Sequence, residues 1–352
     1  MNTTSDRDPK GETVRQLTFI GKHQLEWQDV ADPIIEQPTD ALVRPIAVAT
    51  CDLDAGMLAG RVPIAGPFAF GHECVADVVQ LGSGVRDVAV GDRVVVPFQL
   101  SCGTCESCAR GYTGSCRSVP AGSAYGLGSL GRGNAGMLSD LLRVPLADHM
   151  LVTLPTGVDP VAVASASDNI PDGWRTVAPQ LAERPGADVL IVGGGAAGIP
   201  FYAIDIARAL GAARVDYIDT DRRRLDLAAS LGASVLEGPP PRKAGRYPIT
   251  VDASADVAGL ACALRSTEPD GVCTSIGIYF SETTPVPLLE MYTRGITFKT
   301  SRVHARACIP DVLALAAAGR IHPERVTGAV APWQDAAEAL AHHTTKTVIS
   351  RV

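Results

Sequence analysis

The sequence has no excess of positive charge, few aromatic residues and no long apolar run. Its 352 residues hold 31 Lys and Arg against 38 Asp and Glu, and the net charge is −7. No global basic field therefore exists to hold nucleic acid or an anionic membrane, and the 5% aromatic content argues against a base-stacking binder. No apolar run approaches about 18 residues, the length of a membrane span, and no signal-peptide core is visible. We therefore expect a cytoplasmic protein with small-molecule partners.

The remaining composition predicts a folded chain of two domains. Hydrophobic residues make up 46% and charged residues 20%, and domains average about 150 residues. Residues 1–10 are typical of a disordered tail. From Val14 to about Phe98, short β segments alternate with Gly and Pro, which favours a barrel-like region. From Ala187 onward strands alternate with helices, which indicates an α/β domain with a doubly wound parallel sheet.

Four of the nine cysteines stand within fifteen residues. The spacing C-x2-C-x2-C-x7-C supplies four soft ligands in a Gly-rich segment, which predicts a structural zinc site; a redox disulfide pair is the alternative. A closed four-thiolate site leaves no open position, so this zinc would hold a loop and do no chemistry. The expected ligands are Cys102, Cys105, Cys108 and Cys116. We expect core thiols at Cys74, Cys262, Cys273 and Cys308.

A glycine-rich turn follows the buried strand segment ADVLIV and opens a helix. Gly193, Gly195 and Gly198 fit G-x-G-x-x-G, which in this context predicts a dinucleotide pyrophosphate at the helix N-terminus. Asp219 ends the next strand, where a carboxylate accepts from both ribose hydroxyls and favours NAD(H) over NADP. Three arginines follow at 222–224 and could blunt this preference, and we assign two of them to a solvated helix face.

The order of the motifs ATCDLD, GHE, the cysteine lobe and VGGGAAG resembles the zinc-dependent medium-chain alcohol dehydrogenase family over nearly the whole chain. The segment SDNIPDG is closest to formaldehyde-dehydrogenase-like members. The resemblance implies a GroES-like β-barrel catalytic domain at 11–169 and 303–352, with the zinc lobe at about 99–118. It implies a Rossmann NAD-binding domain at 170–302.

The resemblance also implies a catalytic zinc held by Cys51, His72 and Asp168. In this family an acidic residue orients the histidine and another lies beside the zinc, which correspond here to Asp54 and Glu73. The backbone of Ile276 and Ile278 matches positions that contact the nicotinamide amide, and Lys346 matches a basic residue near the pyrophosphate. We therefore expect two Zn²⁺ per chain and NAD(H).

The sequence departs from the family at the proton relay. A hydroxyl and a histidine are usual where Leu53 and Gly56 stand, and neither of these carries a proton. Asp52 replaces a residue that is often basic. Asp52, Asp54 and His304 are candidate proton carriers, and an ordered water is the alternative.

The expected function is hydride transfer between NAD(H) and an alcohol, aldehyde or ketone. Without the usual relay, an NAD(P)H-dependent reductase of activated C=C or C=N bonds is an alternative, and a non-catalytic dinucleotide-binding protein is another. The family forms dimers and tetramers through its cofactor domains, so we expect a homodimer or homotetramer.

Overall fold

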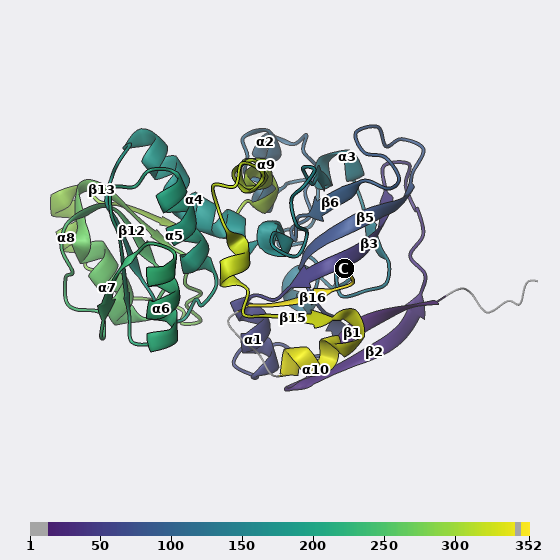
Figure 1. The fold of residues 1–352 in the computed structure, drawn as a ribbon, viewed down its shortest axis with the longest axis horizontal. Coiled ribbons are helices and arrows are strands. Elements are labelled where there is room, and N and C mark those ends of the chain that lie inside the picture. The colour runs from purple at the N-terminus through teal and green to yellow at the C-terminus, as the bar shows by residue number, and fades with distance from the viewer. Residues whose placement is uncertain (1–12, 342–345) are drawn as a thin grey trace, which may run out of the picture.

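The computed structural model describes residues 13–341 and 346–352, so the tail expected at 1–10 lies outside the described residues. Two bodies lie side by side (Figure 1): a parallel sheet with its helices, and a body built mainly of antiparallel strands. Within the described ranges, no helix combines the length and apolarity that a bilayer crossing requires.

The first body contains a six-stranded sheet in the order β11-β10-β9-β12-β13-β14, with every neighbouring pair parallel. The central strand β9 reads VLIV and is buried at all four positions, as a strand covered on both faces requires. This order confirms the doubly wound sheet. The strands are β9 Val189–Val192, β10 Val215–Asp219, β11 Ser234–Glu237, β12 Tyr247–Asp252, β13 Thr267–Ser275 and β14 Thr297–Thr300.

Helices connect these strands, and two of them begin at aspartate caps. The carboxylate of Asp221 accepts from two backbone amides at the start of α6, and that of Asp256 does the same for α7. By contrast α5 begins after Gly198, which offers no side-chain cap. The helices of this body are α4 Asn169–Glu183, α5 Ile199–Ala209, α6 Arg222–Ser230, α7 Val257–Ser266 and α8 Leu288–Arg294.

The second body is built on a sheet in the order β15-β16-β3-β5-β6-β8, with β7 also paired to β3, and on a smaller sheet β2-β1-β4. The last strand, β16, pairs with β3, so the C-terminal strand completes a sheet formed mainly by residues from the first half of the chain. The strands are β1 Thr13–Gly21, β2 Gln24–Ala31, β3 Ala41–Ala49, β4 Phe68–Ala69, β5 Glu73–Leu81, β6 Arg93–Val96, β7 Leu142–Val144, β8 Val152–Thr153, β15 Ala329–Pro332 and β16 Thr347–Ser350.

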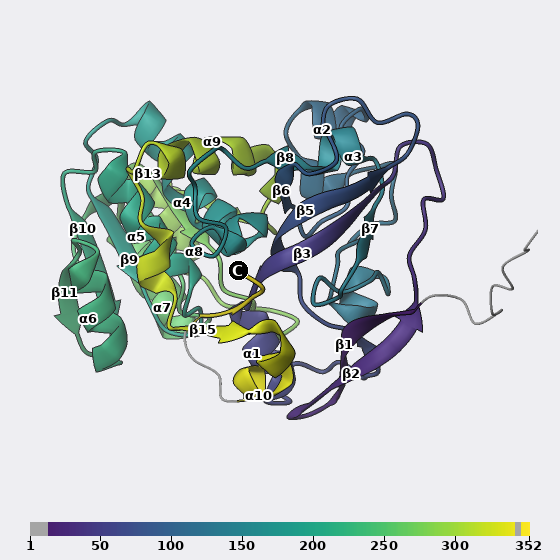
Figure 2. The same ribbon diagram turned by 45° about the vertical axis from the view of Figure 1, so that its right-hand side comes forward.

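One hydrophobic core runs through both bodies. Val75 of β5 belongs to the same buried cluster as Val177 of α4, Phe201 of α5 and Ile309 of α9. Helix α9 crosses between the bodies beside α4 (Figure 2), so the boundary is packed. The remaining helices are α1 Asp52–Leu58, α2 Glu106–Ala109, α3 Ala147–Met150, α9 Ala305–Ala317 and α10 Ala336–Ala341, with short 3-10 helices at Thr113–Ser115, Gly128–Gly131, Ala164–Ser167, Pro323–Val326 and Trp333–Asp335.

All nine cysteines are free thiols. Cys74, Cys262 and Cys273 are fully buried, as expected of core residues. Cys308 is the exception because it is half-buried on α9.

Candidate functional site

Cys51 lies in the turn between β3 and α1, where local hydrogen bonds fix its thiol. The Cys51 backbone N–H donates to Oδ2 of Asp54 at 2.9 Å, and the N–H of Leu53 donates to the Cys51 Sγ at 3.2 Å. Together these bonds form a capping box at the start of α1. The spacing C-x-x-D therefore holds a buried sulfur and a buried carboxylate in one turn.

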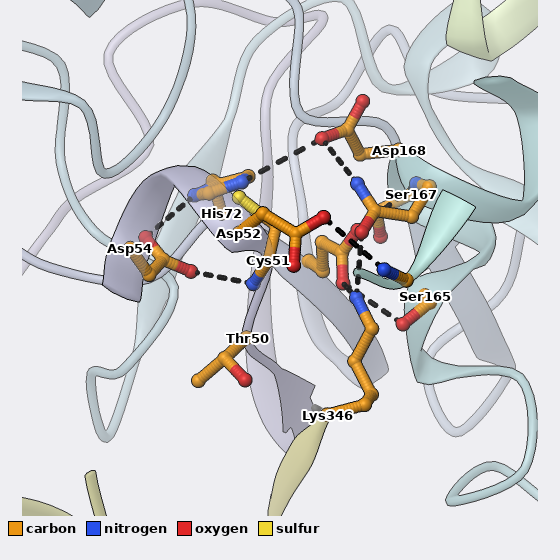
Figure 3. Close-up of polar contacts among 12 residues, drawn as sticks. Thr50, Cys51, Asp52, Asp54, His72, Ser165, Ser167, Asp168 and Lys346 are labelled. Carbon is orange, nitrogen blue, oxygen red and sulfur yellow. Dashed lines mark hydrogen bonds and ion pairs between the residues drawn. The ribbon is translucent and has the colours of Figure 1, made fainter. Parts of the chain in front are cut away.

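His72 lies between two carboxylates, with Asp54 on one side and Asp168 on the other (Figure 3). Its Nδ1 is 3.3 Å from Oδ1 of Asp54, and its Nε2 is 3.6 Å from Oδ2 of Asp168. Burial acts to lower the pKa of His72, but Asp54 and Cys51 raise that pKa well above its ordinary value. The surroundings of the imidazole therefore favour a positive charge.

The Cys51 sulfur, a His72 ring nitrogen and an Asp168 carboxylate oxygen lie within 4.8 Å of one another. Burial raises the pKa of the Cys51 thiol to about 12, so its thiolate forms readily only beside a cation. Thiolate, imidazole and carboxylate are the ligands that zinc prefers. Three such ligands facing one point fit a zinc ion with a fourth position open to substrate.

A buried network braces the loop that carries Asp168. The Asn169 side-chain amide donates to Oδ2 of Asp168 at 3.0 Å. Glu73 accepts from the Asn169 backbone at 2.9 Å, from the Ser165 hydroxyl at 2.9 Å and from Lys346 at 3.0 Å. Lys346 also donates to Oδ1 of Asn169 at 2.7 Å. Glu73 and Lys346 therefore contact the support of Asp168, and both are almost completely buried.

The four cysteines of the 102–116 lobe form a second cluster. Their sulfur atoms lie within 4.8 Å of one another, and none of the four lines the large cavity described below. Backbone amides of Cys105 and Arg117 donate to sulfur atoms at 3.3 and 3.4 Å, which stabilises thiolates. Four convergent thiols fit a closed zinc site.

His304 connects this lobe to the start of α9. Its Nδ1 accepts from the Gly114 backbone N–H at 3.1 Å, and its ring lies 5.3 Å from that of Tyr112. His304 does not line the cavity, whereas Val303 beside it does. His304 therefore contacts the cysteine lobe and does not line the cavity.

The glycine-rich turn joins β9 to α5 and leaves no room for side chains. A Cβ on Gly193 would overlap the Tyr217 hydroxyl, and one on Gly195 would lie 2.8 Å from the Cβ of Ala255. Gly198 is backed by Asn169 and Lys346, since a Cβ there would lie 3.3 Å from Oδ1 of Asn169. The absence of side chains at these glycines lets a ligand approach the backbone closely at the start of α5.

Asp219 ends β10 beside this turn, and both of its carboxylate oxygens accept bonds. Tyr217 donates to Oδ2 at 2.6 Å, and Arg224 donates to Oδ1 at 2.8 Å. Arg222 and Arg223 are exposed, as expected for two of the three arginines. The third arginine, Arg224, pairs with Asp219 and offsets part of its negative charge.

Asp52 is the first residue of α1, and its side chain reaches the start of α5. Its Oδ2 accepts from the backbone N–H of Ala197 at 2.7 Å and of Gly198 at 3.1 Å. The carboxylate therefore joins the two bodies at the glycine-rich turn.

A cavity of about 710 Å³ lies between the two bodies and brings these features together. Its wall includes the three convergent ligands, the glycine-rich turn at Gly195 and both expected nicotinamide positions, Ile276 and Ile278. Leu53 and Gly56 also line it, so neither relay position offers a hydroxyl or an imidazole there.

Asp172 is a cavity residue that sequence reasoning missed. It lies one helical turn after Asp168 on α4, lines the cavity and pairs with Arg175. Burial raises the pKa of Asp172 to about 6. The spacing of four residues from a candidate ligand was the signal that could have found it.

Two family descriptions match the chain. "Alcohol dehydrogenase GroES-like domain" covers residues 37–156, and "Zinc-binding dehydrogenase" covers residues 198–318. The first match contains Cys51, His72 and the four-cysteine lobe, and the second begins at Gly198.

Individual proteins are similar over most of the chain. A probable zinc-binding alcohol dehydrogenase of Mycobacterium tuberculosis is 31% identical over 93% of this chain and 85% of its own length. A glutathione-independent formaldehyde dehydrogenase of Pseudomonas aeruginosa is 31% identical over 63% of this chain and 58% of its own. The structure of an alcohol dehydrogenase from Thermus sp. ATN1 matches with a TM-score of 0.86 and 29% identity, covering 96% of this chain and 99% of that one.

Proposed function

The chain belongs to the zinc-dependent alcohol dehydrogenase family of medium-chain dehydrogenases, as its motifs predicted, and we propose that NAD(H) is its hydride carrier. It is a zinc-dependent oxidoreductase of the alcohol/aldehyde class that uses a nicotinamide cofactor. The observation that carries the proposal is one cavity lined both by the ligands Cys51, His72 and Asp168 and by the glycine-rich turn.

Cys51, His72 and Asp168 would hold the catalytic zinc. Zinc in such a site supplies a Lewis acid that polarises the substrate oxygen and lowers the pKa of a hydroxyl. Asp54 fixes the orientation of His72 through Nδ1, and Asn169 fixes that of Asp168. Glu73 and Lys346 hold Asn169 in place through hydrogen bonds to its backbone and side chain, and Glu73 directly follows the ligand His72 in the sequence.

The cofactor would lie across the edge of the parallel sheet. The N–H groups at the start of α5 would donate to the pyrophosphate. The backbone of Ile276 and Ile278, which line the cavity, would face the nicotinamide amide. Asp219 favours NAD(H), since its carboxylate suits two ribose hydroxyls and repels a 2′-phosphate. Arg224 offsets part of that repulsion, so we expect a preference for NAD(H) and not an absolute choice.

The four-cysteine lobe would hold a second zinc with a structural role. None of its four cysteines lines the cavity, so the metal there would support the fold and take no part in the reaction. The full protein would then carry two zinc ions per chain.

We further propose a cytoplasmic homodimer or homotetramer with small-molecule substrates. Nine free thiols suit a reducing compartment. The edge strand β14 is largely exposed, and Leu288, Leu289 and Tyr292 of the neighbouring α8 are each more than 60% exposed, which supports association through this body. Neither nucleic acid nor a membrane is an expected partner at a net charge of −7.

A substrate panel tests the reaction. Primary and secondary alcohols are assayed with NAD⁺ and NADP⁺, and aldehydes, ketones, activated alkenes and iminium compounds with NADH and NADPH. Reversible turnover of an alcohol–carbonyl pair, faster with NAD(H), is the expected result. Turnover confined to C=C or C=N substrates would instead support an NAD(P)H-dependent reductase that lacks the usual proton relay.

A further inference from the structure

Helix α5 differs from α6 and α7 in which residue supplies the carboxylate that accepts hydrogen bonds from its first backbone N–H groups. In α6 and α7 the acceptor is the residue directly before the helix, Asp221 or Asp256. In α5 that position is Gly198, and the carboxylate comes from Asp52, about 145 residues earlier and in the other body. Asp52 is therefore a contact between bodies and not a local cap.

The two amides that Asp52 occupies are the ones that a phosphate needs. The first N–H groups of a helix have no partner within it and carry partial positive charge, and the eleven-residue α5 adds its dipole. The Asp52 oxygen lies 2.7 and 3.1 Å from them, at ordinary hydrogen-bond distance. A diphosphate oxygen and this carboxylate oxygen cannot accept from the same N–H groups at once.

The turn is packed against a buried network, which favours displacement of the carboxylate over movement of the turn. Gly198 is backed by Asn169 and by Lys346, whose Cε would lie 3.5 Å from a Cβ at this position. The Lys346 ammonium is bonded to Glu73 and Asn169, so it stays behind the turn. We therefore expect the carboxylate to be the group that leaves, and it would then lie beside a second negative charge.

Resting on the proposed function, we propose that Asp52 is an intramolecular competitor of the cofactor diphosphate. It holds the Ala197 and Gly198 amides in the cofactor-free protein and is displaced when the dinucleotide binds. The displaced charge weakens cofactor binding and speeds cofactor release. Asp52 is thus an affinity-determining residue that links cofactor exchange to the contact between the bodies.

The test compares Asp52→Asn with the wild-type protein. Asparagine keeps an oxygen acceptor for the two amides and removes the charge, and Asp52→Ser serves as a second variant with a smaller side chain. The matched control is Asp148→Asn, because Asp148 also accepts from two consecutive backbone amides, those of Arg86 and Asp87, in the antiparallel body. NADH binding is measured by fluorescence titration, and ADP and adenosine by displacement of NADH.

Removing the charge should raise the affinities for NADH and ADP by about tenfold. The affinity for adenosine, which lacks phosphate, should be unchanged. Stopped-flow release of NADH should slow by a similar factor, and Asp148→Asn should match the wild type in every measurement. Unchanged NADH and ADP affinities in both Asp52 variants would overturn the competitor role of Asp52 and leave the proposed function intact. An equal gain in the affinity for adenosine would also overturn the role of Asp52 as a competitor of the diphosphate. A wild-type protein that binds neither NADH nor NADPH would overturn the proposed function as well.

Discussion

The imidazole Nδ1 of His72 lies 3.3 Å from Oδ1 of Asp54, and both side chains are 1% exposed. This contact turns the other ring nitrogen toward Asp168. A carboxylate in this position holds the histidine tautomer that a metal ligand needs.

Asp54→Asn should therefore weaken zinc binding at the catalytic site, although the Asp54 side chain does not line the cavity. We expect kcat/KM to fall by about tenfold or more, and one zinc to leave the protein faster in the presence of a chelator. Asp140→Asn is the control, because Asp140 is a paired carboxylate in the antiparallel body that does not line the cavity. Equal zinc retention in Asp54→Asn and the wild type would contradict this role.

Cys108→Ser should remove the lobe zinc and spare the cavity. We expect one zinc per chain instead of two and an unfolding temperature lower by at least about 5 °C, since the lobe loses its cross-link. Cys262→Ser changes a buried thiol outside both clusters and should keep both metals. Metal analysis and thermal unfolding measure the two effects, and two zinc ions retained in Cys108→Ser would refute the lobe site.

Asp219→Gly should shift the cofactor preference. Removing the carboxylate leaves the Arg224 guanidinium without its anionic partner. We therefore expect kcat/KM with NAD⁺ to fall by about tenfold and the ratio of kcat/KM with NADP⁺ to that with NAD⁺ to rise. Arg222→Ala is the control, because Arg222 is exposed and pairs with Asp226 and Glu237. A wild-type preference for NADP⁺ would argue against the role given to Asp219.

Lys346→Met should lower stability because it leaves Glu73 buried without its cation. The Lys346 ammonium lies 3.0 Å from the Glu73 carboxylate, and both side chains are at most 1% exposed. We expect a loss of about 3 kcal/mol in the free energy of unfolding, measured in urea. Adding Glu73→Gln should restore part of that loss, whereas exposed Lys22→Met should have no effect. Failure of the second substitution to restore any stability would contradict the pairing.

Segments with a strong local signal were predictable from the sequence. The buried run of β9, the glycine turn and the start of α5 follow from residue pattern alone. The four-cysteine cluster follows from its spacing. In contrast, the pattern does not predict α4 because Pro171, Gly173 and Pro179 lie in it, and Pro is tolerated mainly in a first helical turn.

Contacts between distant residues were beyond reach of sequence pattern. Cys51, His72 and Asp168 were linked only through the family resemblance, since no spacing connects them. The bond from Gly198 to Asp52 joins residues 146 positions apart, and the one between Lys346 and Glu73 joins residues 273 apart. Such pairs depend on how the two bodies pack, which local propensity does not encode.

The zinc content of Cys51→Ser, measured together with its turnover, tests the central claim most directly. Cys51 would ligate the catalytic zinc, so we expect the wild type to carry two zinc ions per chain and the variant to carry one. The variant should lose turnover and still bind NADH, because the glycine-rich turn is unchanged. A variant that keeps two zinc ions and full turnover would contradict the assignment of a catalytic zinc to Cys51, His72 and Asp168.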